Sequence, residues 1–119
     1  MVSILVAEDD KSFGRVLRTE LEDEKYVVHL VEDGVKAVLS FIDHAYEMVV
    51  LDLKMPRLDG NDVLKIIKKL NPRVPVIAIS GNAGNSEMAE SLECGALKCL
   101  TKPFKIEELK REIKLSLKE

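Results

Sequence analysis

Short apolar runs alternate with longer stretches of mixed polarity along the whole chain. Five runs rich in aliphatic and β-branched residues are Val2–Ala7, Val27–Val31, Met48–Leu51, Pro75–Ile79 and Leu97–Leu100. A strand with one face in water alternates apolar and polar residues, whereas these runs are mostly continuous. They therefore predict five strands of a parallel sheet that is covered on both faces.

The stretches between and after these runs carry apolar residues at helical spacing. The five sets are Phe13, Val16, Leu17 and Leu21; Val35, Val38, Leu39 and Ile42; Val63, Leu64, Ile67 and Leu70; Met88, Ala89 and Leu92; and Ile106, Leu109, Ile113 and Leu117. Five strands that alternate with five helices predict an α/β fold with a doubly wound parallel sheet, because crossovers between parallel strands are usually right-handed helices.

Several residues are expected to end these helices. Ser12 is a candidate N-cap of the first helix, and Asn71-Pro72 is expected to stop the third. The fourth helix is expected from Asn85 to Cys94, with Gly95 as its C-terminal cap.

Polar and charged residues follow each run. In open α/β sheets, functional groups gather beyond the carboxyl ends of the strands. Three carboxylates, a hydroxyl and an ammonium are therefore expected at one edge of the sheet: Glu8, Asp9, Asp52, Ser80 and Lys102. Each has an ordinary explanation on its own, as a solvated acidic loop, a turn cap or a surface lysine. The functional interpretation depends on their joint arrangement.

Clustered carboxylates repel one another and need protons or a cation to coexist. All-oxygen ligands favour a hard cation, and Mg2+ binds through one or two carboxylates together with waters and phosphate oxygens. A further carboxylate beside that cation is a competent nucleophile toward a phosphoryl group. Lys102 and Ser80 would supply the remaining electrostatic stabilisation.

The composition narrows the class of protein. The chain has 119 residues, enough for one domain, and a net charge of −3, which argues against nucleic acid as a direct partner. No apolar run is long enough to span a membrane, and the N-terminus lacks the basic start of a signal peptide. Cys94 and Cys99 have no companion ligands at zinc spacing and are expected to be reduced thiols in a cytoplasmic protein.

Four segments in their order and separation resemble the receiver domain of bacterial two-component response regulators, over essentially the full length. They are ILVAEDD (Ile4–Asp10), VVLDLKMPRLDG (Val49–Gly60), PVIAISG (Pro75–Gly81) and GALKCLTKPF (Gly95–Phe104). The resemblance implies a flavodoxin-like (βα)5 fold with strand order 2-1-3-4-5. It also implies a phosphoryl group taken from a phosphohistidine of a sensor histidine kinase or a phosphotransfer protein.

The resemblance assigns a role to each matching residue. Asp52 aligns with the phosphoacceptor, and Lys102 with the lysine that pairs with the acidic centre. The implied Mg2+ ligands are Glu8, Asp9, Asp52 and the backbone carbonyl of Lys54. Ser80 aligns with the switch hydroxyl, Gly81 with a small residue that leaves room for the phosphoryl group, and Pro103 with a position that is often preceded by a cis peptide bond.

Two positions depart from the family pattern. Cys99 stands where the family usually has the Tyr or Phe that rotates with the switch hydroxyl, so switching would rest on Ser80 and on repacking around a smaller side chain. Glu8 replaces the commoner Asp. A redox role for Cys99 lacks a resolving partner nearby in the sequence. Lys54 and Asn82 are expected to tune the lifetime of the phosphorylated state.

Three functions compete. The first is a receiver domain that spans residues 1–119 and binds a downstream protein. It either has no output domain or is excised from a longer protein. The expected binding face is formed by the fourth helix, the fifth strand and the fifth helix (87–117). The second is a magnesium phosphohydrolase, but Lys54 stands where such an enzyme needs an acid. The third is a phosphorylation-independent interaction module, which the Cys99 substitution alone supports.

Overall fold

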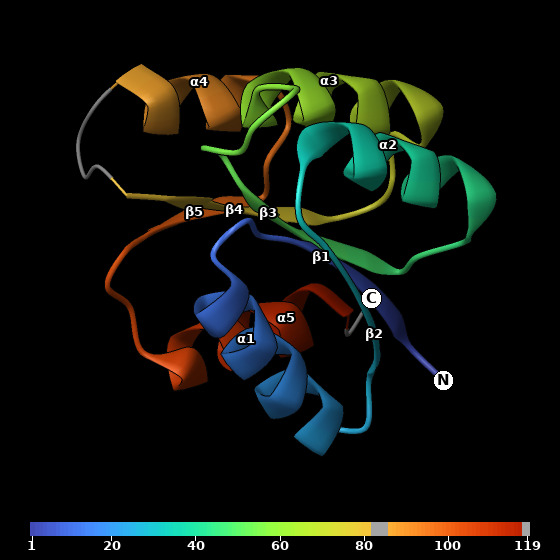
Figure 1. Ribbon diagram of the computed structural model, residues 1–119, viewed down its shortest axis with the longest axis vertical. Helices are drawn as coiled ribbons and strands as arrows, with labels where there is room; N and C mark the ends of the chain where they lie inside the picture. Colours follow the sequence, from blue (N-terminus) through green and yellow to red (C-terminus); the bar gives the residue numbers. More distant parts are fainter. Residues whose placement is uncertain (82–85, 118–119) are drawn as a thin grey trace.

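The computed structural model describes residues 1–81 and 86–117 and contains a five-stranded parallel sheet in the order β2-β1-β3-β4-β5 (Figure 1). The strands are β1 (Ser3–Ala7), β2 (Val27–Val31), β3 (Met48–Asp52), β4 (Val76–Ser80) and β5 (Lys98–Thr101). The helices are α1 (Lys11–Asp23), α2 (Gly34–Asp43), α3 (Gly60–Leu70), α4 (Ser86–Glu93) and α5 (Ile106–Leu117). The predicted fold class and strand order are confirmed.

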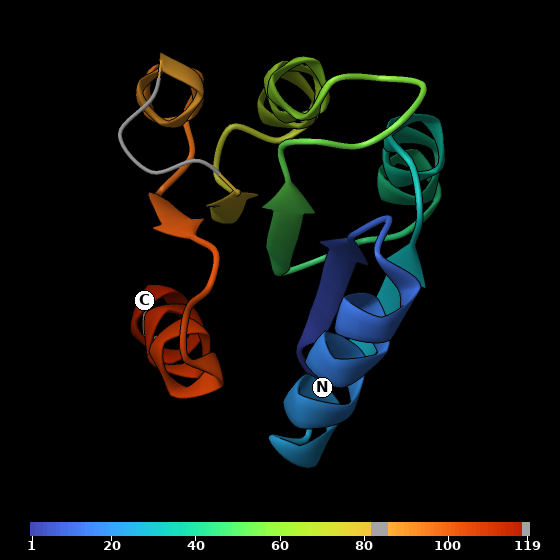
Figure 2. The same cartoon turned by 60° about the vertical axis from the view of Figure 1, so that its left-hand side comes forward.

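Helices cover both faces of the sheet. α1 and α5 lie on one face, and α2, α3 and α4 lie on the other (Figures 1 and 2). Two apolar clusters fill the spaces between these layers, one around Leu51 and Leu64 and the other around Val50 and Leu109. All five residues of both β3 and β4 are buried. Burial on two faces explains why the apolar runs are continuous rather than alternating.

The strand register aligns the ends of the strands at one edge. Ala7 pairs with Leu51, Asp52 with Ile79, and Ser80 with Thr101. The loops after β1, β3, β4 and β5 therefore begin close together. This is the edge at which sequence reasoning expected the charged residues.

The expected cap of α1 was wrong, and so was part of the apolar face expected in α2, where Val38 packs against the core but Val35, Leu39 and Ile42 are exposed. Val16, Leu70 and Leu92 of the other expected faces are exposed as well. α1 begins at Lys11, and its N-cap is Asp10, whose carboxylate accepts a hydrogen bond from the backbone amide of Phe13, not Ser12. In α2 the buried residues are Gly34, Ala37 and Phe41. Small residues face inward there because the helix approaches its neighbours closely; a Cβ on Gly34 would lie 2.7 Å from Leu58 Cβ.

The other helix boundaries largely agree with expectation. α3 ends at Leu70 with Asn71 as C-cap, and Gly95, with φ of +110°, follows α4. The predicted start of α4 at Asn85 lies outside the described residues, and Ser91 is its buried residue. Cys94 and Cys99 are half-buried free thiols. None of the helices in the described ranges is long and apolar enough to cross a membrane.

Gly60 is required by the close approach of α3 to the loop after β3. A Cβ at this position would lie 2.7 Å from the carbonyl oxygen of Leu53. Gly60→Ala should therefore lower the free energy of unfolding by about 2 kcal/mol, although alanine normally favours a helix. Urea denaturation measures this change. Gly81→Ala, where a Cβ meets no atom within 4 Å, is the control and should change stability little; equal losses in both variants would contradict the packing argument.

Candidate functional site

Three carboxylates meet at the carboxyl edge of the sheet. Glu8 and Asp9 directly follow β1, and Asp52 is the last residue of the adjacent strand β3. One oxygen from each lies within 4.8 Å of the others. Glu8 is 1% exposed and Asp52 is 3% exposed, whereas Asp9 is exposed. The structure thus brings together the acidic residues that the sequence predicted.

Lys102 provides the positive charge nearest to the buried acids. Its Nζ lies 3.2 Å from Asp52 Oδ2 and 3.3 Å from Glu8 Oε1. Two backbone amides support the same carboxylates: Lys54 N donates to Asp52 Oδ1 at 2.9 Å, and Asp10 N donates to Glu8 Oε2 at 3.1 Å. Charge-assisted bonds of this kind offset part of the cost of removing the acids from water.

The loop after β5 holds Lys102 in place. Its backbone amide donates to the Ser80 carbonyl at 2.8 Å, and the Lys102–Pro103 peptide bond is cis, as the resemblance implied. The ammonium lies 4.9 Å from the centre of the Phe13 ring, which packs edge-on against Phe104. A cation over an aromatic face is attracted to it electrostatically. Phe13 therefore helps to fix Lys102, a role that sequence reasoning missed.

The site holds a proton that an ordinary carboxylate would lose. Burial, together with the neighbouring Asp52 carboxylate, raises the pKa of Glu8 from 4.5 to about 8. Burial alone would lower the pKa of Lys102, but the negative charges of Asp52 and Glu8 outweigh it and raise that pKa. At neutral pH Glu8 is therefore largely protonated and Lys102 is charged.

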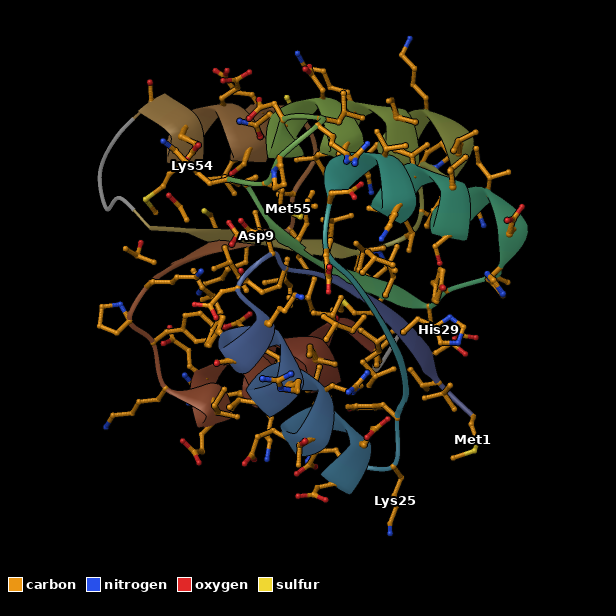
Figure 3. The ribbon with its side chains drawn as sticks, in the orientation of Figure 1. Met1, Asp9, Lys25, His29, Lys54 and Met55 are labelled. Atoms are coloured by element: carbon orange, nitrogen blue, oxygen red, sulfur yellow. The ribbon has the colours of Figure 1, made fainter. Side chains whose placement is uncertain are left out.

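The residues fit a hard divalent cation. Every acidic donor is an oxygen, and Glu8 Oε1 is buried without a hydrogen bond among the described residues, despite its proximity to Lys102. Glu8 Oε1, which forms an ion pair with Lys102, lies beside two further carboxylates, and this set of oxygens is a suitable ligand set for Mg2+. The backbone of Lys54 lies in the loop after β3 (Figure 3), and metal binding by its carbonyl stays a prediction.

Ser80 lies at the end of β4 and is completely buried. Its hydroxyl donates a hydrogen bond to Glu87 Oε1 at 3.1 Å, which ties the sheet edge to the first turn of α4. The sequence indicated Ser80 as a functional residue but gave no reason to pair it with Glu87. An acid in the first turn of a helix is common, because the helix dipole favours it there. Asn82 lies outside the described residues.

Cys99 pairs with Ala78 in the β4–β5 register and contacts the apolar cluster between the sheet and α2 and α3. Burial raises the pKa of its thiol, so the group stays protonated at neutral pH. A protonated thiol is a poor nucleophile toward oxidants. The structure therefore favours a small packing residue at this position over a redox sensor.

Comparisons with known proteins agree on one family. A family model described as response regulator receiver domain matches residues 4–114. The transcriptional regulatory protein YkoG of Bacillus subtilis is 34% identical over 116 residues, which are 98% of this chain and 51% of that protein. Response regulator MprA of Mycobacterium sp. strain KMS is 37% identical over 108 residues, 91% of this chain and 47% of that protein. The chain thus spans about half the length of these relatives.

Solved structures have the same fold. The receiver domain of Francisella response regulator 1452 superposes with a TM-score of 0.91 at 34% identity, covering 98% of this chain and 96% of that one. The receiver domain of sensor histidine kinase PA1611 from Pseudomonas aeruginosa gives a TM-score of 0.92 at 32% identity, covering 99% and 98%. That structure has a magnesium ion coordinated in its active site cleft.

The raised pKa of Glu8 predicts a pH-dependent stability. Between pH 4.5 and about 8 the folded protein keeps a proton that the unfolded chain has lost. The free energy of unfolding should therefore fall as pH rises from 5 to 8, by at most about 1.4 kcal/mol per pH unit from this group. Urea denaturation in metal-free buffer measures it. In Glu8→Gln the free energy of unfolding should fall less over this pH range, whereas the exposed control Glu93→Gln should behave like the parent. If the free energy of unfolding of Glu8→Gln depends on pH as steeply as that of the parent, the raised pKa does not belong to Glu8.

Proposed function

We propose that this chain, which belongs to the response regulator receiver domain family of two-component systems, accepts a phosphoryl group on Asp52. One observation carries the proposal: a buried carboxylate at the end of a central strand lies 3.2 Å from a lysine ammonium and within a cluster of two further acids. Receiver domains are signalling domains rather than turnover enzymes. The proposed output is accordingly a change in protein binding.

The proposed reaction is a displacement at phosphorus. A carboxylate oxygen of Asp52 attacks the phosphoryl group of a phosphohistidine on a histidine kinase or phosphotransfer protein. A P–O bond forms, the P–N bond breaks, and the released imidazole takes up a proton. Lys102, charged at neutral pH, offsets negative charge that gathers on the phosphoryl oxygens.

Mg2+ held by Glu8, Asp9, Asp52 and the Lys54 carbonyl would neutralise further phosphoryl charge and hold the acidic residues together when bound. The exposed side of the cluster is formed by Asp9, which leaves a path for a solvated cation. The protonated state of Glu8 means that this residue must lose its proton to serve as an anionic ligand.

We propose that the signal leaves the site through Ser80 and Glu87. In the unphosphorylated protein the Ser80 hydroxyl is engaged with the Glu87 carboxylate. A phosphoryl oxygen on Asp52 would compete for this hydroxyl, and its added negative charge would repel the carboxylate. The first turn of α4 would then separate from the sheet edge. This route needs no rotating aromatic residue at position 99.

Residues 1–119 are proposed to form a receiver domain that contacts a downstream protein through α4, β5 and α5. YkoG and MprA, which are about twice as long as this chain, are named as a transcriptional regulatory protein and a response regulator. A further domain of a longer protein is therefore one candidate for the contacting partner, and a separate protein is another.

The phosphoacceptor role predicts a covalent adduct. Incubation with a small phosphodonor in a buffer containing Mg2+ should add the mass of one phosphoryl group, measured by intact mass spectrometry. Asp52→Ala should lose the adduct, while Asp62→Ala, which changes an exposed aspartate of α3, should retain it. An adduct that persists in Asp52→Ala would contradict the proposal, and no adduct in any protein would favour the phosphorylation-independent module.

The Ser80–Glu87 route predicts a local change in α4. Phosphorylation should increase amide hydrogen exchange in 86–93 of the parent protein, measured by mass spectrometry. Glu87→Gln keeps a hydrogen-bond acceptor but removes the repelled charge, so the increase should be roughly fivefold smaller. Glu90→Gln, an exposed position on the same helix, is the control. An equal increase in the parent and in Glu87→Gln would rule out this route while leaving phosphorylation itself intact.

A further inference from the structure

α2 carries an exposed apolar stripe on its outer side. Val35, Leu39 and Ile42 are 41%, 55% and 60% exposed, and their spacing places them on one face of the helix. Leu70, at the end of α3, is 52% exposed and lines the same shallow hollow as Ile42. Figure 2 shows α2 and α3 beside each other on the outside of the molecule.

This stripe is not the core-facing side of the helix. The buried residues of α2 are Gly34, Ala37 and Phe41, and Ala37, Phe41 and the half-buried Val38 belong to or pack against the apolar cluster on this face of the sheet. Single exposed apolar residues are ordinary on a protein surface, but neighbouring ones on a single helix face are typical of an interaction site.

The charges beside the stripe indicate what covers it. Lys36 lies near the N-terminal end of α2 and Asp43 at its C-terminal end, and both are exposed. They are seven residues apart, which places them on the same flank of the stripe. Neither forms an ion pair within the part of the chain that the structure describes.

We propose that two copies of this chain pair through α2 in an antiparallel two-fold arrangement, with Lys36 of each copy facing Asp43 of the other. A two-fold axis across the helix places the same flank of both copies together and reverses their direction. Each lysine then meets an aspartate, whereas a parallel two-fold arrangement would place the two charged flanks on opposite sides of the contact, where no lysine meets an aspartate. The stripe and its charges thus complement a second copy of themselves.

The contact is small, because α2 has 10 residues. Interfaces of this size lie below those of permanent dimers, so the association should be weak and dependent on concentration. Its two ion pairs are solvent-exposed, so added salt should weaken it further. The pairing does not require phosphorylation, so the unphosphorylated parent protein should dimerise.

Sedimentation equilibrium of the 119-residue chain over a range of protein concentrations tests the proposal. The parent should show a monomer–dimer equilibrium, and Leu39→Asp should abolish the dimer. Leu115→Asp on α5 is the matched control, because Leu115 is also 55% exposed; it should leave the dimer unchanged. All positions changed are exposed, and a thermal melt verifies that each variant is folded.

A charge exchange tests the orientation. Lys36→Glu alone should weaken the dimer by roughly five- to tenfold, since two attractive pairs become repulsive, and so should Asp43→Lys. The double variant Lys36→Glu with Asp43→Lys should restore the parent affinity. A monomer at every concentration, a dimer lost in Leu115→Asp but kept in Leu39→Asp, or a double variant no stronger than the single ones would overturn the proposal.

Discussion

The ammonium of Lys102 lies between two carboxylates that the sheet has removed from water. It is 3.2 Å from Asp52 and 3.3 Å from Glu8, and it offsets one unit of negative charge while the site contains three acids. Two backbone amides donate hydrogen bonds to these carboxylates and offset part of the remaining negative charge. Glu8 also holds a proton at neutral pH, because its pKa is raised to about 8. A site with this excess of negative charge favours an added cation, and under the proposed function Lys102 would also stabilise a phosphoryl group on Asp52.

The parallel sheet fixes this arrangement. Burial of β1, β3 and β4 on both faces sets the register of their ends, so residues from distant parts of the chain emerge beside one another. The same burial keeps Ser80 and Asp52 from solvent. Burying the acids at this edge lowers the stability of the fold, because a carboxylate loses its hydration there. A carboxylate surrounded by fixed dipoles and an ammonium is, however, better positioned for phosphoryl transfer than one in water.

Much of the fold and the site could be predicted from the sequence. Continuous apolar runs indicate strands buried on both faces, and a parallel sheet places the residues that follow its strands at one edge. The errors have specific physical causes. In α2, hydrophobicity favoured Val35, Leu39 and Ile42 as the inward face, whereas close packing selects Gly34 and Ala37. Asp10 caps α1 because it lies one residue before the first turn. The contact between Ser80 and Glu87 depends on where α4 begins in space, which residue patterns do not encode.

In the proposed function, Glu8, Asp9 and Asp52 form a cation site, and Glu8 holds a proton when no metal is bound. The most direct measurement is the melting temperature with and without Mg2+ at constant ionic strength, at pH 5 and pH 8, for the parent and for Asp9→Asn. A ligand that binds the folded state raises the melting temperature, and competition with protons weakens that effect at low pH. We expect Mg2+ to raise the melting temperature of the parent more at pH 8 than at pH 5, and we expect no rise in Asp9→Asn. No rise in the parent, or an equal rise in Asp9→Asn, would contradict the proposed cation site.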